Sequence, residues 1–194
     1  MSVAAIILNR IKYMPKGRPF SSERFAEVGS RAAVDKAVSR MVAAGALERV
    51  TRGVYMRPKV SPFAGVVRPS ANSVVQVVAK HNRETIQIHG AEAVRQLNLS
   101  TQMQTRPVFY TSGSSRELRF GKTIVQFQHV SQEKLQCAGT KAGMALVAMF
   151  YLGREGLSSE ILERIKSKLT SVEFKRLTAC TMPAWMQSAV RQVM

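Results

Sequence analysis

The sequence contains very few of the residues that support metal-dependent phosphate chemistry. Asp35 is the only aspartate among 194 residues, and the pattern places it inside a helix. A nuclease or nucleotidyltransferase of the metal-dependent kind needs clustered carboxylates that hold Mg²⁺ and align phosphates. We therefore expect neither activity. More generally, we expect no enzyme, no catalytic residue and no cofactor.

Histidine and cysteine are also scarce, and their spacing is not that of a metal site. His81, His89 and His129 show neither an HxxxH nor an HExxH pattern. Cys137 and Cys180 lie far apart in sequence and form no CxxC pair. We expect no bound metal and two buried free thiols. His89, which precedes Gly90, is as consistent with a cap as with a metal ligand.

Long apolar runs are absent too. The longest, GMALVAMFYLG at residues 143–153, has about half the apolar residues of a membrane-spanning helix, so it predicts a buried helix. Residues 1–14 lack the early positive charge and the cleavage site of a secretory signal. We expect a cytoplasmic protein that does not bind membranes.

Positive charge is what the sequence has in excess. It contains 29 lysines and arginines against 12 acidic residues, which gives a formal net charge of +17. Residues 1–60 hold 12 of these cations and four acidic residues. So large an excess favours a polyanionic partner, either nucleic acid or an anionic membrane surface. Because no membrane-like segment is present, nucleic acid is the better hypothesis.

The N-terminal third has the periodicity of three helices. Apolar residues three and four apart predict helices over residues 2–13 and 30–45, and the cap residue Ser21 followed by Glu23 predicts another helix over 21–28. Phe20 and Phe25 have the spacing of a hydrophobic staple around the start of the second helix. Two short helices joined by a glycine-containing turn form a helix-turn-helix unit, whose second helix enters the major groove of DNA. The third helix is therefore the predicted recognition helix.

Two short β-prone runs follow the third helix at residues 47–57, around an Arg-Gly turn. This pattern predicts a wing, whose arginines suit phosphates or a minor groove. On the third helix, Arg31 lies in the N-terminal turn that usually meets base edges. The predicted DNA-binding residues are the polar ones away from the apolar face and those of the wing: Ser30, Arg31, Lys36, Ser39, Arg40, Arg49, Arg52, Gly53 and Arg57.

Residues 61–69 are rich in Pro, Gly and Ser, which marks a linker. We predict an α+β protein with a winged helix-turn-helix DNA-binding domain at 1–58 and a mixed α/β domain at 62–194, with antiparallel strands and C-terminal helices. Ser112–Ser115 is predicted to be a hairpin turn. The elements expected after the linker are helices at 70–81 and 91–97, strands at 85–88, 107–111, 116–120 and 123–130, and helices at 132–152, 158–168, 171–178 and 184–192.

The segment GALERVTRGVY at residues 45–55 resembles the G-x-L-x-R-x-x-R-G-x-Y pattern that closes the winged helix of AbiEi-type proteins, the antitoxins of type IV abortive-infection systems. Further segments resemble one compact branch of this family in the same order. They are PSANS at 69–73, LNLSTQ at 97–102, VFYTSG at 108–113 and MPAWM at 182–186. The resemblance covers nearly the whole chain. It implies a winged helix that autoregulates an operon and a C-terminal domain that counters a nucleotidyltransferase-like toxin.

The combined expectation is a transcriptional autorepressor and antitoxin that binds its own promoter as a monomer or weak homodimer. One winged helix contacts few base pairs among roughly 10⁶ or more competing sites, so we expect two copies on an inverted repeat of double-stranded DNA. The resemblance implies a toxin that is bound directly or countered only functionally.

The alternative function is that of a basic RNA-binding or structural interaction protein without a toxin partner. Phe109, Tyr110, Phe120 and Phe127 lie on predicted strands, where exposed aromatic side chains would stack on RNA bases. The alternation of apolar and polar residues instead places most of them in the core.

Overall fold

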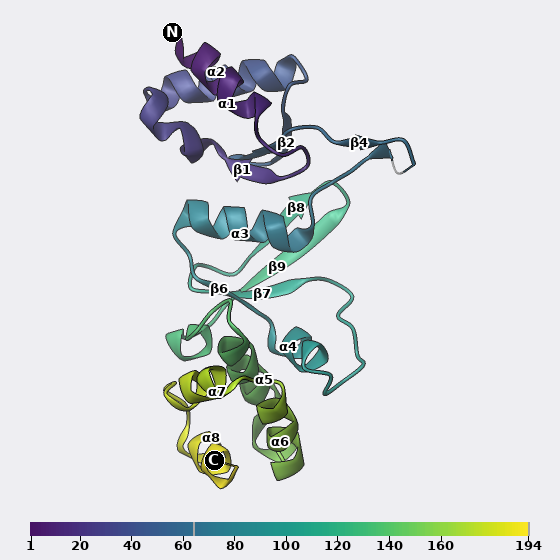
Figure 1. Ribbon diagram of the computed structural model, residues 1–194, viewed down its shortest axis with the longest axis vertical. Coiled ribbons are helices and arrows are strands. Elements are labelled where there is room, and N and C mark those ends of the chain that lie inside the picture. The colour runs from purple at the N-terminus through teal and green to yellow at the C-terminus, as the bar shows by residue number, and fades with distance from the viewer. Residues whose placement is uncertain (64, 194) are drawn as a thin grey trace. The chain divides into compact units, whose positions relative to one another are not determined.

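The computed structural model describes residues 1–63 and 65–193 as a mixed α+β protein (Figure 1). Its contacts divide the chain into two compact units. The first unit comprises Met1–Arg83 and Arg119–Thr123, and the second comprises Glu84–Leu118 and Ile124–Met194. Both an N-terminal helical module with a strand hairpin and a C-terminal group of helices are present, as the sequence predicts.

The first unit begins with the element order of a winged helix. The elements are α1 (Val3–Lys12), β1 (Pro19–Ser21), the 3₁₀ helix η1 (Ser22–Val28), α2 (Arg31–Ala43), β2 (Glu48–Thr51) and β3 (Val54–Met56). The three strands form an antiparallel sheet in the order β1-β3-β2. The predicted recognition helix is therefore α2, and the hairpin β2–β3 is the predicted wing.

The predicted second helix is η1, a 3₁₀ helix rather than an α-helix. Its start matches the prediction, because the Ser21 hydroxyl accepts a hydrogen bond from the Glu23 N–H. The Phe20 and Phe25 rings meet edge to face with centroids 5.9 Å apart, which confirms the staple. Strand β1 was not predicted, since three residues that begin with proline carry little periodic signal.

The predicted linker contains two short paired strands, β4 (Val60–Ser61) and β5 (Gly65–Val66). The next helix, α3 (Ala71–Asn82), confirms the prediction and is capped by the Ser70 hydroxyl. This helix contacts β1 and β3, so the first compact unit extends through Arg83, beyond the boundary near residue 60 that the composition suggests. One contact that holds α3 there is His81 Nδ1, which lies 3.0 Å from Ser21 Oγ of β1.

A four-stranded sheet, most of whose residues belong to the second unit, has the strand order β6-β7-β9-β8. The elements of this region are β6 (Ile86–Ile88), α4 (Gly90–Gln96), β7 (Val108–Thr111), β8 (Arg116–Phe120) and β9 (Thr123–His129). Strands β6 and β7 pair antiparallel, whereas β7 and β9 pair parallel, which was not predicted. The sheet is therefore mixed.

Residues 112–115 are not the predicted hairpin turn, because β9 rather than β8 lies beside β7. The segment instead bonds to the end of β9. The His129 N–H donates to the Ser115 hydroxyl at 2.9 Å, and His129 Nδ1 lies 2.8 Å from the Gly113 carbonyl oxygen. These bonds hold the segment against β9 while it connects β7 to β8.

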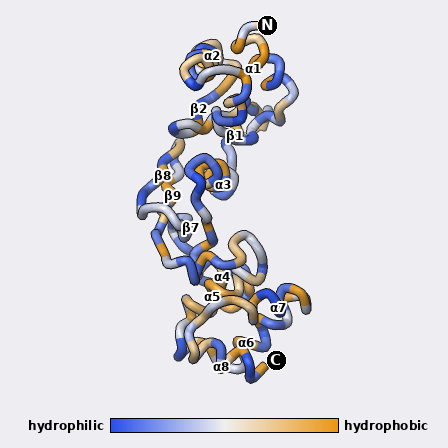
Figure 2. The backbone as a smooth tube through the Cα atoms, turned by 90° about the vertical axis from the view of Figure 1, so that its left-hand side faces the viewer, coloured by the Kyte–Doolittle hydropathy of each residue, from blue (hydrophilic) through white to orange (hydrophobic). Residues whose placement is uncertain are grey.

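The C-terminal part is helical, as predicted. It contains the 3₁₀ helix η2 (Gln132–Leu135), α5 (Lys141–Gly156), α6 (Ser159–Ser167), α7 (Ser171–Thr178) and α8 (Ala184–Gln192). The predicted helix over 132–152 is divided, because Cys137 and Gly139 adopt left-handed backbone angles with φ of 53° and 75°. Helix α5 contacts α4, α7 and α8 and is coloured hydrophobic over much of its length in Figure 2. It is the centre of this unit's core.

The two cysteines lie far apart in the sequence but meet in the structure. Cys137 Sγ and Cys180 Sγ are 3.8 Å apart, and both thiols are free. Cys180 is buried and Cys137 is half-buried. Burial, together with the neighbouring Cys137, raises the pKa of the Cys180 thiol to about 11, so it stays protonated near neutral pH.

Residues 1–63 and 65–193, which the structure describes, contain neither a candidate membrane span nor a candidate metal-binding cluster. None of their helices has the length and apolar character needed to cross a bilayer. No three His, Cys, Asp or Glu side chains in these ranges gather into a group that could hold a metal ion.

His89 caps helix α4 in its uncharged form. Its Nδ1 accepts a hydrogen bond from the Ala91 N–H at 3.1 Å, and its ring packs against the Tyr110 ring with centroids 4.8 Å apart. Burial lowers the pKa of His89 from its ordinary value of 6.5, and the positive charge of Lys134 lowers it further.

The first prediction concerns the pH dependence that His89 causes. The unfolded chain takes up this proton near pH 6.5 and the folded chain only at lower pH, so the free energy of unfolding falls as the pH drops below about 6.5. Asn is a good helix cap that does not titrate here, so His89→Asn should reduce the loss of stability between pH 7 and pH 5. Urea unfolding of both proteins at the two pH values measures this. An undiminished loss in the variant would assign the effect to other groups.

Candidate nucleic-acid interface

Helix α2 has one buried face and one polar face. The Ser30 hydroxyl accepts the Ala33 N–H at 3.3 Å and so defines the start of the helix. Apolar residues pack inward against the unit's core: Val34, Ala37, Val38 and Met41. The four polar residues that the sequence selects on this helix are all exposed: Arg31, Lys36, Ser39 and Arg40.

The wing is fixed by its turn and by a bond from η1. Gly53 has a φ of 73°, a left-handed conformation that glycine adopts without steric cost. Its carbonyl oxygen accepts a hydrogen bond from the Ser22 N–H at 3.3 Å. Arg49 and Arg52 are exposed on this hairpin. The turn therefore holds the arginines of the wing at a defined place next to η1.

A cavity of about 460 Å³ lies between α2, η1 and the wing. We call it the α2–wing cavity. Arg31 from the helix and Arg49 and Arg52 from the wing all line it, as does Gly53. The structure thus brings four of the nine predicted residues to one place. Guanidinium groups bind phosphate oxygens through paired hydrogen bonds, so three arginines around one cavity suit a phosphate-bearing partner.

The acidic residues of the α2–wing cavity do not neutralise these arginines through close ion pairs. Asp35 Oδ2 lies 3.9 Å from Arg31 Nε, and the Arg31 side chain is 93% exposed. An exposed pair at this distance contributes little energy. Glu23, the other carboxylate of the cavity, lies 3.3 Å from His81 Nδ1. The Arg31 guanidinium is therefore accessible to a partner.

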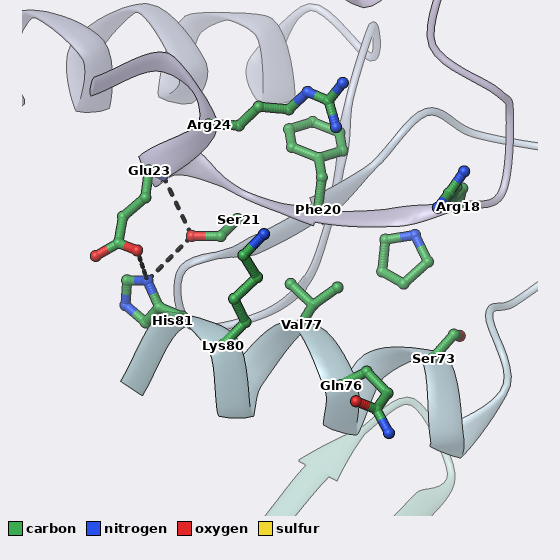
Figure 3. Close-up of a pocket in the computed structure, with 11 residues that line it drawn as sticks. Arg18, Phe20, Ser21, Glu23, Arg24, Ser73, Gln76, Val77, Lys80 and His81 are labelled. Atoms are coloured by element: carbon green, nitrogen blue, oxygen red, sulfur yellow. Dashed lines mark hydrogen bonds and ion pairs between the residues drawn. The ribbon is translucent and has the colours of Figure 1, made fainter. Parts of the chain in front are cut away.

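Helix α3 supports the wing through His81, which the sequence analysis did not select. Figure 3 shows the His81 ring turned toward Ser21 and Glu23. Its Nδ1 lies 3.0 Å from Ser21 Oγ, and its Nε2 would be 3.5 Å from a Cβ on Gly53. His81 therefore packs under both the start of η1 and the turn of the wing. No local pattern could reveal this, because the partners are far away in sequence.

The cavity drawn in Figure 3 lies beside the first, between β1 and α3, and has a volume of about 570 Å³. Arg18, Arg24 and Lys80 line it, and all three are exposed. These cations were not predicted as DNA-binding residues, since none of them lies on the recognition helix or the wing. They extend the basic surface of the first unit away from α2.

Arg57 does not line the α2–wing cavity, although the sequence analysis selected it. Its guanidinium Nη1 donates hydrogen bonds to the carbonyl oxygens of Lys12 and Met14, at 2.6 and 2.7 Å. These bonds hold the end of α1 and the loop that follows it against the last strand of the wing. Arg57 is therefore better placed for stabilising the fold than for binding DNA, and we leave it out of the interface.

The proposed aromatic platform for RNA is not exposed in the structure. Phe109, Tyr110, Phe120 and Phe127 are each at most 8% exposed. Bases stack on aromatic rings only where a ring face is accessible. These side chains form core instead, as the alternation of the strands suggests.

The second prediction separates the role of Arg57 from that of the wing arginines. Arg57→Ala removes two hydrogen bonds from a charged donor to carbonyl oxygens, so the free energy of unfolding should fall by about 1–3 kcal/mol. Arg52→Ala, a matched change at an exposed position, should alter it by less than about 0.5 kcal/mol. Urea unfolding followed by circular dichroism measures both. Equal effects of the two substitutions would contradict a structural role for Arg57.

Comparisons with known proteins place the chain in a family. The profile described as "Family of unknown function (DUF6088)" matches residues 6–177. Among solved structures, the chain is similar to the RV2827C protein from Mycobacterium tuberculosis. The identity is 13%, the alignment covers 97% of this chain and 77% of that one, and the TM-score is 0.41. No curated protein matched the sequence.

Proposed function

The chain therefore belongs to the DUF6088 family, and we propose that it is a DNA-binding transcriptional regulator that represses its own promoter. The observation that carries this proposal is the α2–wing cavity. Arg31 comes from the first turn of α2, and Arg49 and Arg52 come from the hairpin β2–β3. All three line this cavity. A formal net charge of +17 supports the choice of a polyanionic partner.

In the proposed complex, α2 enters the major groove of the duplex and the wing lies along the adjoining backbone. The α2–wing cavity then receives phosphates, which Arg49 and Arg52 bind by paired hydrogen bonds. The first N–H groups of α2 and its helix dipole also favour an anion at this end. Arg31, at the first turn of the helix, reaches a base edge, where arginine pairs with O6 and N7 of guanine.

The third prediction distinguishes backbone contacts from base contacts. Arg49→Ala together with Arg52→Ala should weaken binding to every duplex and reduce the slope of log K against log salt by about 2. Arg31→Ala should instead weaken binding to the promoter by about 1–3 kcal/mol more than binding to a scrambled duplex. Fluorescence anisotropy with both duplexes at several KCl concentrations measures these effects.

The control for this series is Arg176→Ala, alone to match Arg31→Ala and together with Lys175→Ala to match the double variant, because both residues are exposed on α7 in the second unit. The control variants should leave both affinity and salt slope close to those of the unsubstituted protein. If the slope of log K against log salt fell equally in the control, the net charge of the protein, and not the α2–wing cavity, would account for DNA binding. RNA that competes as well as the promoter duplex would favour the RNA-binding alternative.

We also propose an antitoxin function, carried by the second unit, against a nucleotidyltransferase-like toxin. The resemblance to AbiEi-type proteins suggests it, and one structural observation favours it. The second unit has its own core, built from α4 to α8 and strand β7, so it can act apart from the α2–wing cavity.

The fourth prediction tests whether the two functions are separable in the full chain. A variant with Arg31, Arg49 and Arg52 all changed to Ala should no longer repress the promoter, but it should still restore growth when it is co-expressed with the toxin. The test uses a nucleotidyltransferase-like toxin of the AbiE type, expressed from a second plasmid. Loss of growth rescue in this variant, at equal protein level, would mean that protection acts through repression alone.

A further inference from the structure

We propose that Asp35 determines DNA sequence specificity by accepting a hydrogen bond from cytosine N4 in the major groove. This inference rests on the proposed DNA-binding function and identifies the base that Asp35 on α2 contacts. Asp35 lies one helical turn after Arg31 and one turn before Ser39, on the exposed face of the predicted recognition helix. It also lines the α2–wing cavity together with the arginines.

The charge of Asp35 is unfavourable for a surface that only binds phosphates. It is the single aspartate of the chain, and its side chain is 55% exposed on the face that would meet DNA. A carboxylate there repels the phosphates of every sequence and lowers affinity without discrimination. A hydrogen-bond donor on the DNA that meets the carboxylate would offset this cost, and in the major groove such donors are the amino groups of bases.

The chemistry of the major groove selects cytosine among the possible bases. An ionised carboxylate is an acceptor with no donor of its own. Cytosine presents the N4 amino donor, whereas adenine presents its N6 donor beside the N7 acceptor, whose lone pair repels a carboxylate. Guanine N7 and O6 and thymine O4 offer acceptors only. A carboxylate at this position therefore pairs best with cytosine.

Arg31 supplies the complementary preference on the same helix. Its guanidinium is a donor that suits guanine O6 and N7. Four residues of α-helix span about 6 Å, which corresponds to about two base steps along the groove. The inferred recognition element therefore contains a guanine read by Arg31 and a cytosine within about two steps of it.

The alternative role of Asp35 is that of an intrahelical partner of Arg31. That ion pair has a 3.9 Å separation and two exposed side chains, so it has little energy to contribute to the free protein. The two roles predict different behaviour on substitution. If Asp35 is only a partner of Arg31, its substitution changes the affinity equally for all bases. If Asp35 reads a base, its substitution changes the base preference at one position.

The experiment is a selection from a pool of randomised duplexes with the full-length protein, repeated with Asp35→Ala and Asp35→Asn. Asp35→Ala should lose the cytosine preference at one position, by roughly 5- to 100-fold, and keep the rest of the motif. It should also bind scrambled duplex more tightly, because a repulsive charge is gone. Asp35→Asn should shift that position toward adenine, since an amide both donates to N7 and accepts from N6.

The matched control is Glu163→Gln, which neutralises an exposed carboxylate on helix α6 and should select the same motif as the unsubstituted protein. If Asp35→Ala selects the same motif as the unsubstituted protein, including the cytosine, the inference is overturned while the proposed function stands. If both Asp35 variants are folded but select no motif at all, the inference is also overturned, because the effect of Asp35 is then not confined to one base position. Failure of the unsubstituted protein to enrich any duplex overturns the proposed function itself.

Discussion

The burial of one face of α2 determines which side chains the first unit offers to a partner. Val34 and Val38 pack inside against α1 and η1, and Val38 is fully buried. Because α-helical geometry places the other face 180° away, Arg31 and its polar neighbours are turned outward. Any rotation of α2 would expose those valines to water at a cost of about 1.5–3 kcal/mol for each side chain. The core therefore fixes the orientation of the candidate interface.

The second requirement is that the wing stays in place beside α2. The Ser22–Gly53 hydrogen bond and the His81 side chain hold its turn, while Arg57 holds its last strand to the end of α1. Preorganised side chains lose less entropy on binding than mobile ones. A convergence of arginines from a helix and a hairpin is useful only with such support. Helix α3 thus belongs structurally to the first unit and supports its candidate interface, although it lies outside the helix-turn-helix pattern.

Local signals predicted the parts of the fold that depend on neighbouring residues. The predicted helix starts at residues 21, 30 and 70 and the staple of Phe20 and Phe25 are confirmed, because each depends on residues within five positions of one another. These local signals could not predict contacts between elements that lie far apart in the sequence. The parallel pairing of β7 with β9 and the packing of α3 on β1 depend on which surfaces meet, and no periodicity records that.

The candidate site shows the same division. Arg31, Arg49 and Arg52 were selected from helix periodicity and turn chemistry, and they converge as a winged helix requires. Arg57 was selected as an arginine of the same predicted wing, and its hydrogen bonds to the Lys12 and Met14 carbonyl oxygens could be seen only in three dimensions. The most direct test of the central claim follows the arginine Nε–Hε signals by NMR while the promoter duplex is added. We expect large shifts at Arg31, Arg49 and Arg52 and little change at Arg57, whereas shifts confined to arginines of the second unit would contradict the proposed interface.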